Sequence, residues 1–387
     1  MRLYLTDNVW DSALKRINRI FDEFDNVMVS YSGGKDSCVI FNLALKVARE
    51  RNRLPLTVMF IDQEAEWQAT IDNVKTIMES DEVNPLWLQV PIQISNGTSA
   101  DKDWLQVWGD GEEWMREKDP ISIKENVYGT NKFYDIFTKA IGYHFKGKPV
   151  ANLGGVRTEE SPTRFAALTT ALTYRDITWG KKLNEKENQY TFYPIYDWTY
   201  TDVWKAIFDN EWIYNKVYDY QYQYGVPIHS MRVSSLHHET AVGWLFIAQE
   251  IEKETWNRLS KRLSGVSTAG RMGKTNFFVK ELPYMFKDWR EYRDYLTLKI
   301  TSDKHRPIFE KKFDAMDATY KSLNPDHIKE LHKVHVASLI TGDYHFTKVG
   351  NWENKFDVVT WRKWKAGKNP RHAKINKYIL NDLNYED

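Results

Sequence analysis

The stretch VMVSYSGGKDSCVIFNLAL (residues 27–45) decides the fold prediction. It places an apolar run, typical of a buried parallel strand, before two glycines, and an amphipathic run, typical of a helix, after them. Gly33 and Gly34 let the chain turn sharply and let a ligand approach the backbone amides. Those amides, together with the unpaired donors at the start of the following helix, form a pocket of partial positive charge. The stretch therefore predicts a strand, an anion-binding loop and a helix.

The polar side chains of this loop fit a polyphosphate ligand. Lys35 adds a full positive charge, and Ser32 and Ser37 supply hydroxyl donors. Asp36 could cap the helix or hold Mg²⁺. The GxxxxGK(S/T) spacing of a Walker A loop is absent, and an ordinary strand-to-helix turn capped by Asp or Ser is the alternative interpretation.

Strand-like and helix-like segments alternate over the first 235 residues. The expected strands are 27–32, 56–62, 86–91, 149–155 and 190–195, and the expected helices are 9–24, 36–51, 66–78, 131–145, 161–174 and 199–210. This alternation predicts an α/β fold, a doubly wound, parallel-stranded sheet with helices on both faces. Residues 92–130 interrupt the alternation, and we predict that they form an insertion over one edge of the sheet.

The strand signal disappears beyond residue 236. We therefore predict two domains, a nucleotide-binding domain over residues 1–235 and a mainly helical domain over residues 236–387. The second domain carries a basic tail, residues 361–377, with seven Lys or Arg and no acidic residue. A solvated tail and a surface that binds nucleic acid or an acidic partner both fit this composition. The chain has no overall basic excess, because 54 Lys and Arg stand against 53 Asp and Glu.

Cys38 is the only cysteine of the sequence. Within one chain this excludes a disulfide framework, a dithiol relay, and a zinc or iron–sulfur site built on cysteines. The first residues lack the apolar stretch of a signal peptide, and the apolar run 241–248 is too short to cross a bilayer. We predict a cytoplasmic protein that does not associate with a membrane.

Three blocks of the sequence resemble one family. SGGKDS (32–37) resembles the PP-loop of the N-type ATP pyrophosphatases. LGGVRTEESPTR (153–164) resembles the arginine-bearing block of the phosphoadenosine phosphosulfate (PAPS) reductase family, and YPIYDWTYTDVWKAI (193–207) resembles that family's Pro-Ile-x-x-Trp-Thr-x-x-Asp-Val-Trp block. The blocks come in the family's order, and the resemblance covers about residues 20–235. It implies a sheet like that of the adenine nucleotide alpha hydrolases.

A further block, HSMRVSSLHHETA (229–241), resembles an extended branch of bacterial and phage proteins. This branch contains the immunoglobulin-binding regulator A proteins and is often associated with a ParB-like protein. The resemblance therefore makes a ParB-like protein a candidate partner, but it names no reaction.

The family resemblance implies binding of ATP or a related adenylyl compound, with Mg²⁺, and cleavage between the α and β phosphates. The loop would hold the leaving pyrophosphate, and positioning and electrostatics would carry the chemistry. Catalytic roles are predicted for Lys35, Asp36 and Arg157, with Asp36 as a possible Mg²⁺ ligand. The predicted nucleotide-binding residues are Ser30, Ser32, Gly33, Gly34, Lys35, Asp36, Ser37, Asp62, Gly155, Arg157 and Arg164.

Asp62 and the two arginines also have other interpretations. Asp62 closes the second expected strand, where a carboxylate could accept a hydrogen bond from adenosine, hold a metal or cap a helix. A planar guanidinium group suits phosphate or sulfate. Arg157 and Arg164 could instead pair with Glu159 or Glu160 as ordinary ion pairs.

The sequence departs from the PAPS reductases in its thiols. Reduction in that family requires a cysteine near the C-terminus whose thiolate attacks the sulfuryl group, and no such residue is present here. Cys38 is expected to face the sheet and to be inert. We therefore predict that the chain is not a thiol-dependent PAPS reductase.

Three functions remain open. We favour an enzyme, an ATP pyrophosphatase that transfers the adenylyl group to an unidentified acceptor. A nucleotide-binding regulator that acts with a ParB-like partner is the first alternative. The second alternative is a component of a nucleic-acid modification system that binds through Arg362, Lys363, Lys365, Lys368 and Arg371.

Overall fold

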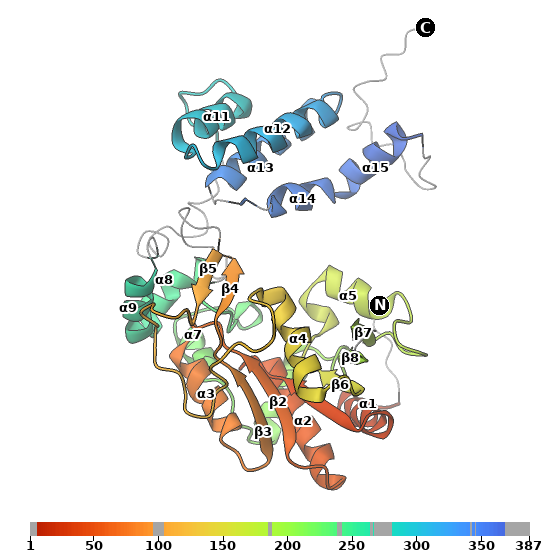
Figure 1. Cartoon of the computed structure of the whole chain (residues 1–387). Coiled ribbons are helices and arrows are strands. Elements are labelled where there is room, and N and C mark those ends of the chain that lie inside the picture. Colours follow the sequence, from red (N-terminus) through yellow and green to blue (C-terminus); the bar gives the residue numbers. More distant parts are fainter. Residues whose placement is uncertain are drawn as a thin grey trace. The chain divides into compact units, whose positions relative to one another are not determined.

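The computed structural model describes residues 6–95, 104–184, 188–237, 242–263, 266, 281–340, 343–344 and 346–367. The chain forms two compact units (Figure 1). Unit 1 comprises residues 1–98 and 104–270, and unit 2 comprises residues 99–103 and 271–387. Unit 1 contains the central sheet, and the described part of unit 2 contains helices and no strand.

A six-stranded sheet forms the centre of unit 1 (Figure 1). Its strand order is β3 (Val83–Leu88), β2 (Leu56–Ile61), β1 (Asn26–Ser30), β6 (Val150–Leu153), β8 (Gln189–Phe192) and β7 (Gly180–Asn184). All neighbouring strands run parallel except β7, which is antiparallel to β8. The order reverses between β1 and β6, and a reversal of this kind leaves a crevice at the carboxyl ends of the strands, where ligands of open α/β sheets bind.

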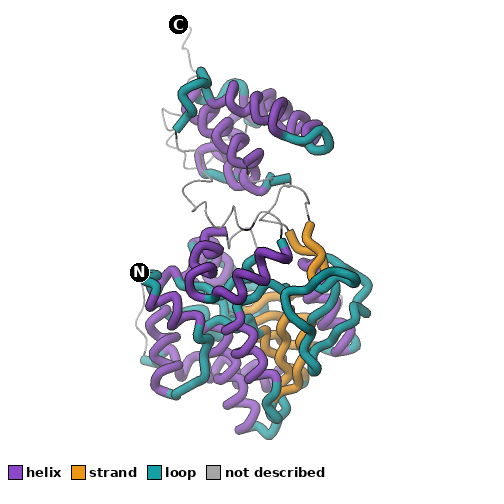
Figure 2. Tube along the Cα trace, turned by 90° about the vertical axis from the view of Figure 1, so that its left-hand side faces the viewer, coloured by secondary structure: helices purple, strands orange, loops and turns teal. Residues whose placement is uncertain are grey.

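Helices flank the strands on both sides (Figure 2). Those of unit 1 are α1 (Val9–Glu23), α2 (Lys35–Glu50), α3 (Gln68–Met78), α4 (Phe133–Phe145), α5 (Pro162–Thr169), α6 (Tyr200–Asp209), α7 (Val217–Gln223), α8 (Val242–Ile251) and α9 (Lys253–Arg262), with the 3₁₀ turns η1 (Thr158–Glu160) and η3 (Ile228–Ser230). Val27 and Val29 of β1 share a buried core with residues of α1, α2, α3 and α6. Met28 is also buried but faces the other side, as the alternation of a strand requires. The predicted α/β fold is confirmed.

One helix and one strand of the sheet differ from the sequence expectation. The helix expected over 161–174 ends at Thr169, and strand β7 was not expected. The sequence of β7 is GKKLN, and both of its lysines are exposed. Exposed lysines are typical of an edge strand, because they oppose pairing with further strands, and they also remove the apolar signal by which a strand is recognised.

Local signals set the starts of the helices beside the sheet edge. Helix α5 begins with Ser161, whose hydroxyl caps the first turn, followed by Pro162. Helix α6 begins with a capping box between Thr199 and Asp202, which agrees with the expected helix start. Helix α2 begins after Gly34, which has no side chain to act as a cap, so its first amides are left to other acceptors.

The expected insertion lies beside β3, an edge strand of the sheet. It contains the antiparallel pair β4 (Ile92–Ser95) and β5 (Trp104–Val107), and Ile123 pairs with the last residue of β3 in a parallel bridge. The buried carboxylate of Glu64 accepts a hydrogen bond from the amide of Trp108 at 2.8 Å. This contact fixes the insertion to the loop that follows β2.

Unit 1 extends to residue 270, beyond the boundary expected near residue 236. Helices α8 and α9 pack on this unit through polar contacts. Glu252, between the two helices, accepts a hydrogen bond from the amide of Gln68 at the start of α3, at 2.7 Å. Arg262, at the end of α9, pairs with the buried Glu64 at 2.8 Å.

The helices of unit 2 agree with the expected helical C-terminal region. They are α11 (Trp289–Tyr295), the π-helical segment η5 (Leu296–Ile300), α12 (Arg306–Tyr320), α13 (Pro325–Ile340), α14 (Thr347–Glu353) and α15 (Phe356–Lys365). Trp361 of the predicted basic tail is buried in the core of this unit, and Arg362, Lys363 and Lys365 lie in the last turn of α15. Lys368 and Arg371 lie outside the described residues. No described helix is both long and apolar enough to cross a membrane.

The ion pair of α9 allows a test of how unit 1 is held together. Arg262→Ala should lower the free energy of unfolding by about 3 kcal/mol, because it leaves the Glu64 carboxylate buried without its cation. Lys261→Ala, at an exposed neighbouring position, should change it by less than about 0.5 kcal/mol. Urea unfolding followed by tryptophan fluorescence measures both values. Equal changes in the two variants would contradict the structural role of the pair.

Candidate functional site

A cavity of about 1130 Å³ opens at the carboxyl ends of β1, β6 and β8. It lies where the strand order reverses, and all three sequence blocks of the family resemblance contribute to its lining. The predicted binding residues that line it are Ser30, Ser32, Gly34, Lys35, Asp36, Ser37, Gly155, Arg157 and Arg164. The other two predicted binding residues, Gly33 and Asp62, do not line the cavity.

Ser37 and Gly33 fix the shape of the loop. The hydroxyl of Ser37 donates to the carbonyl of Gly34 at 2.9 Å and accepts from the amide of Ser32 at 3.2 Å. Gly33 has a φ of +71°, a conformation that other residues adopt only with strain. A Cβ atom on Gly33 would also lie 2.7 Å from Cγ2 of Thr70. The second and the sixth residue of SGGKDS therefore cannot be exchanged freely.

The first amide of α2 has an acceptor within the protein. The amide of Lys35 donates to the hydroxyl of Tyr218 at 3.0 Å, and the Lys35 ammonium group lies 5.6 Å from the centroid of the Tyr218 ring. Burial raises the pKa of Tyr218, so its hydroxyl stays neutral at physiological pH. No sequence pattern indicates Tyr218, because this residue reaches the loop from α7, 183 positions along the chain.

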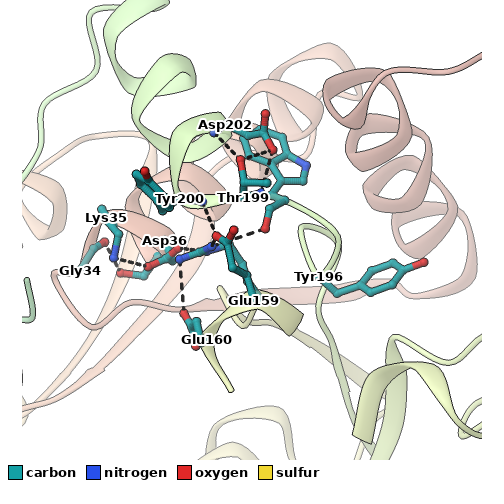
Figure 3. A network of polar contacts seen from close by, with 12 residues as sticks. Gly34, Lys35, Asp36, Glu159, Glu160, Tyr196, Thr199, Tyr200 and Asp202 are labelled. Atoms are coloured by element: carbon teal, nitrogen blue, oxygen red, sulfur yellow. Dashed lines mark hydrogen bonds and ion pairs between the residues drawn. The ribbon is translucent and has the colours of Figure 1, made fainter. Parts of the chain in front are cut away.

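A cluster of ion pairs stands beside the loop (Figure 3). Nε of Arg157 donates to Oδ1 of Asp36 at 2.5 Å, and its Nη1 donates to Oε2 of Glu159 at 2.9 Å. Glu160 lies 3.9 Å from Nη2 of the same arginine, and Nζ of Lys35 lies 3.1 Å from Oδ2 of Asp36. Arg157 is only 3% exposed. Asp36 therefore bridges Lys35 and Arg157, the two cations predicted to be catalytic. Arg157 also lies beside Glu159 and Glu160, the carboxylates expected as its partners if it formed only ordinary ion pairs.

The start of α5 and the start of α6 extend this cluster. Arg164, near the start of α5, pairs with Glu160 and lines the cavity with a half-exposed side chain. The amide of Tyr200, the first residue of α6, donates to the carboxylate of Glu159 at 2.6 Å. Both predicted arginines thus have carboxylate partners, with which a ligand phosphate would have to compete.

Gly155 is required because two backbone segments touch at this point. A Cβ atom on Gly155 would lie 2.7 Å from the backbone carbon and oxygen of Asp36 and 2.8 Å from the amide nitrogen of Ser37. These are backbone atoms, so no side-chain rotation relieves the clash. The loop after β6 therefore presses on the first turn of α2, and this contact sets the approach of Arg157 to Asp36.

Three polar side chains cross the cavity floor on adjacent strands. Oγ of Ser30 donates to Oδ1 of Asn152 at 2.7 Å, and Nδ2 of Asn152 donates to Oγ1 of Thr191 at 3.0 Å. The three residues come from β1, β6 and β8, and all of them line the cavity. Asn152 and Thr191 were not among the residues predicted from the sequence. The polar Asn152 inside the apolar run VANL is the signal that would have indicated the first of them.

Asp62 closes β2 as expected but does not line the cavity. Its fully buried carboxylate accepts hydrogen bonds from Nε1 of Trp87 at 3.0 Å and Nε2 of Gln89 at 2.9 Å. It also pairs with Arg116 of the insertion at 2.5 Å. Charge compensation inside the protein explains this position, because a buried carboxylate is stable only with a cation or several donors beside it. The predicted contact of Asp62 with nucleotide therefore has no support in this arrangement.

The predicted Mg²⁺ also lacks a ready-made site in the described part of the chain. No group of three or more His, Cys, Asp or Glu side chains that could hold a metal occurs there. Both carboxylate oxygens of Asp36 already face cations, Oδ1 toward Arg157 and Oδ2 toward Lys35. This donor set does not fit a resident metal ion, and Mg²⁺ at Asp36 stays a prediction from the family resemblance.

A smaller pocket of about 410 Å³ adjoins the cavity and shares Ser30 and Ser32 with it. Its apolar lining comprises Met59, Phe60, Ile61, Phe133, Phe137 and Val233. Glu66 also lines it, and burial, with a smaller contribution from the charge of Asp62, raises the pKa of Glu66 to about 8. This carboxyl group is therefore mostly protonated at neutral pH, and the pocket suits an uncharged, mainly apolar group.

Cys38 lies in the core on the buried side of α2. Its Sγ is 3.1 Å from the carbonyl oxygen of Ile213. Burial raises the pKa of the thiol to about 12, so the nucleophilic thiolate is nearly absent at neutral pH. The burial expected for this residue is confirmed.

Comparisons with known proteins give matches over both parts of the chain. Residues 26–224 match the family described as phosphoadenosine phosphosulfate reductase domain, and residues 225–370 match a domain of unknown function (DUF3440). The uncharacterised protein YbdN of Escherichia coli is 30% identical over 300 residues, which cover 74% of this chain and 73% of YbdN. An uncharacterised protein of Methanocaldococcus jannaschii is 32% identical over 193 residues, which cover 50% of this chain and 38% of that protein.

Two solved structures show a distant likeness. The FMN adenylyltransferase of Candida glabrata is 14% identical, with 56% of this chain and 62% of that chain covered and a TM-score of 0.35. The phosphoadenylyl-sulfate (PAPS) reductase of Candida auris is 16% identical, with 62% of this chain and 99% of that chain covered and a TM-score of 0.35. Likeness at this level carries no argument about the function of the chain.

The close approach at Gly155 can be tested by adding one methyl group. Gly155→Ala should lower the free energy of unfolding by about 1–3 kcal/mol, because the backbone of α2 has to move away. Gly350→Ala is the control, since its Cβ would meet no heavy atom within 4 Å and alanine favours the helix. Chemical denaturation of both variants gives the comparison. An unchanged stability of Gly155→Ala would show that the two segments are not in contact.

The reactivity of Cys38 follows from its burial. With a pKa of about 12, on the order of one thiol in ten thousand is ionised at pH 8. A thiol reagent should therefore leave the folded protein unlabelled over an hour at pH 8 and label it fully in urea. Mass spectrometry of the two samples measures this difference. Rapid labelling of the folded protein would reopen a thiol mechanism.

Proposed function

This chain belongs to the phosphoadenosine phosphosulfate reductase domain family, and on that premise we propose that it binds ATP or a related adenylyl compound at the switch point of its sheet. The observation that carries the proposal is the position of the SGGKDS loop, which faces a cavity of about 1130 Å³ beside β1 and β6. Ligands of open α/β sheets bind at such a position. The cavity is also large enough for a nucleotide.

The charge of the cavity lining supports a polyanionic ligand. The charged groups in the lining are the cations Lys35, Arg157, Arg164, Lys181 and Arg232 and the carboxylates Asp36, Glu159 and Glu160. Five positive charges minus three negative charges leave a formal excess of +2. The start of α2 adds a partial positive charge from its helix dipole. A positive excess in a concave site raises the local concentration of anions and favours their binding.

The two adjoining cavities suit the two ends of a nucleotide. The proposal places the phosphates at the loop, where Lys35 and the amides of α2 lie. It places the base in the smaller pocket, whose walls are mainly apolar and whose Glu66 is mostly neutral. Ser30 and Ser32 line both spaces, so one ligand can extend from one space into the other.

The proposed reaction is the transfer of an adenylyl group. An oxygen of the acceptor attacks the α-phosphorus, the bond from this phosphorus to the oxygen that bridges to the β-phosphate breaks, and pyrophosphate leaves with the electron pair of that bond. Lys35 and the loop amides would stabilise the charge that grows on the leaving pyrophosphate. Asp36 and Arg157 would act by position, because their ion pair fixes the first turn of α2.

A thiol-dependent reduction is not proposed, although the family is defined by PAPS reductase. Cys38 is the only cysteine of the sequence, and it lies buried with its pKa raised to about 12. A thiol in that state neither reaches a substrate nor supplies a thiolate. We therefore propose that this chain has the family's nucleotide-binding site but does not catalyse the thiol-dependent reduction for which the family is named.

A nucleotide-binding regulator with a ParB-like partner is the second candidate. The observation that favours it is the pairing of two of the three cavity arginines with carboxylates, Arg157 with Asp36 and Glu159 and Arg164 with Glu160. Because carboxylates already compensate the charge of these arginines, less positive charge is left to stabilise a transition state. The resemblance of residues 229–241 to the immunoglobulin-binding regulator A branch supports the same candidate. A role in nucleic-acid modification stays a prediction from the composition of the tail.

Lys35→Ala tests the nucleotide site. The affinity for α,β-methylene ATP should fall roughly tenfold or more, because the variant loses one charge-assisted contact to phosphate. Lys46→Ala, an exposed lysine farther along α2, should keep the affinity of the wild type. Isothermal titration calorimetry gives both values. Wild-type affinity in a correctly folded Lys35→Ala protein would contradict the proposal.

A turnover assay distinguishes an adenylyl-transferring enzyme from a nucleotide-binding regulator. The protein is incubated with ATP labelled in the α-phosphate, with and without cell extract, and both pyrophosphate release and labelled products are measured. A labelled product that forms together with pyrophosphate supports the adenylyl transfer. Saturable binding of ATP without pyrophosphate release in any extract supports the regulator. An absence of ATP binding contradicts both candidates.

A further inference from the structure

Two cations of the cavity lining take no part in the phosphate loop. Lys181 of β7 and Arg232, two residues after η3, both line the cavity and are exposed. Within the described residues neither forms an ion pair with a carboxylate, whereas Lys35, Arg157 and Arg164 all do. The formal excess of two positive charges in the cavity lining is therefore carried by these two side chains.

Two hydrogen bonds join the backbone of Arg232 to α7. Gln221, which is fully buried, donates from Nε2 to the carbonyl of Arg232 at 2.7 Å and accepts from the amide of Arg232 at 3.1 Å. Four residues farther on, the amide of Leu236 donates to the carbonyl of Ala65 at 2.7 Å. Hydrogen bonds thus hold both ends of the segment 232–236. The guanidinium group of Arg232 is presented to the cavity from a rigid backbone, and only its side-chain rotamers remain free.

Tyr193 lies beside Lys181 in the wall of the cavity. The ammonium group of Lys181 lies 5.9 Å from the centroid of the Tyr193 ring. Burial lowers the pKa of Arg164, and the charge of Arg232 lowers it further, so these two arginines lie within electrostatic reach of each other. Arg164 has Glu160 as a partner, but the positive charge of Arg232 still repels it. An anion placed between them would relieve this repulsion.

Lys181 is separated from the loop along the sheet. Strand β7 lies three positions from β1 in the order β1, β6, β8, β7. Neighbouring strands are roughly 4.8 Å apart, so about 14 Å separates the two strands. A phosphate held by the amides after β1 is too far away for Lys181 to contact. Lys181 and the loop therefore serve two different anionic groups.

We propose that Arg232 and Lys181, with Arg164 beside them, form a second anion subsite that binds the acceptor. This inference rests on the proposed function, because it assigns the loop to the phosphates of the nucleotide. A guanidinium group offers paired donors to a carboxylate, phosphate or sulfate, and the lysine adds a point charge. The acceptor is therefore an acidic molecule, which carries an anionic group in addition to the oxygen that attacks the α-phosphorus.

Sulfate titrated into the full-length protein saturated with α,β-methylene ATP tests the subsite. At constant ionic strength, the dissociation constant for sulfate should rise at least tenfold in Arg232→Gln and in Lys181→Gln. Lys182→Gln is the matched control, because this exposed lysine neighbours Lys181 on β7 and points to the other side of the strand. Its sulfate affinity should equal that of the wild type. Parallel titrations with phosphate and acetate distinguish the class of anion.

Equal sulfate affinity in the wild type and all three variants would overturn the subsite, as would an absence of binding of all three anions to the wild type. A loss of nucleotide affinity in Arg232→Gln with sulfate affinity retained would assign this side chain to the nucleotide and would also overturn the subsite. Failure of α,β-methylene ATP to bind the wild type contradicts the proposed function instead. The same comparison of variants without nucleotide then decides the subsite.

Discussion

The ion pair between Asp36 and Arg157 is the contact on which the geometry of the cavity depends. It joins the first turn of α2 to the loop after β6, and these two segments follow the strands on either side of the switch point. Both side chains are largely buried, so the pair is short and charge-assisted, and loss of either partner would leave a charge without compensation. Gly155 makes the pair possible, because only a residue without a Cβ atom allows the two backbones to come so close. Charge and sterics thus hold the loop together.

The same pair determines what a ligand has to displace. Asp36 holds Lys35 with one oxygen and Arg157 with the other, and the hydroxyl of Tyr218 takes the first amide of α2. Three of the donors that a phosphate would use, the ammonium group of Lys35, the guanidinium group of Arg157 and the first amide of α2, therefore already have partners inside the protein. An incoming phosphate exchanges one set of charge-assisted hydrogen bonds for another, so each single contact gains little. Affinity then has to come from many contacts at once and from the positive excess of the lining, which suits a polyphosphate better than a single anion.

The sequence predicts well those parts of the fold that depend on neighbouring residues. The apolar run, the glycines and the amphipathic run of residues 27–45 are adjacent, so the strand, the loop and the position of the loop at the carboxyl edge of the sheet were predictable. Contacts between distant segments were not. Tyr218 and Asn152 reach residues of the loop and of β1 across 183 and 122 positions, and Arg116 reaches Asp62 across 54. No local pattern marks such partners, and the polar edge strand β7 lacks the apolar signal on which strand prediction depends.

The wall of the cavity shows that the first part of the second matched region, up to residue 270, belongs to the same structural unit as the first matched region. The second match begins at residue 225, yet Arg232, Val233 and Ser234 line the same cavity as the SGGKDS loop. Helices α8 and α9 come from the second match too, and they belong to unit 1 through contacts such as Arg262 with Glu64. The sheet and its loop therefore cannot complete the cavity alone. The loop comes from the first match and this wall from the second, so both matched parts of the sequence are needed to build the one cavity.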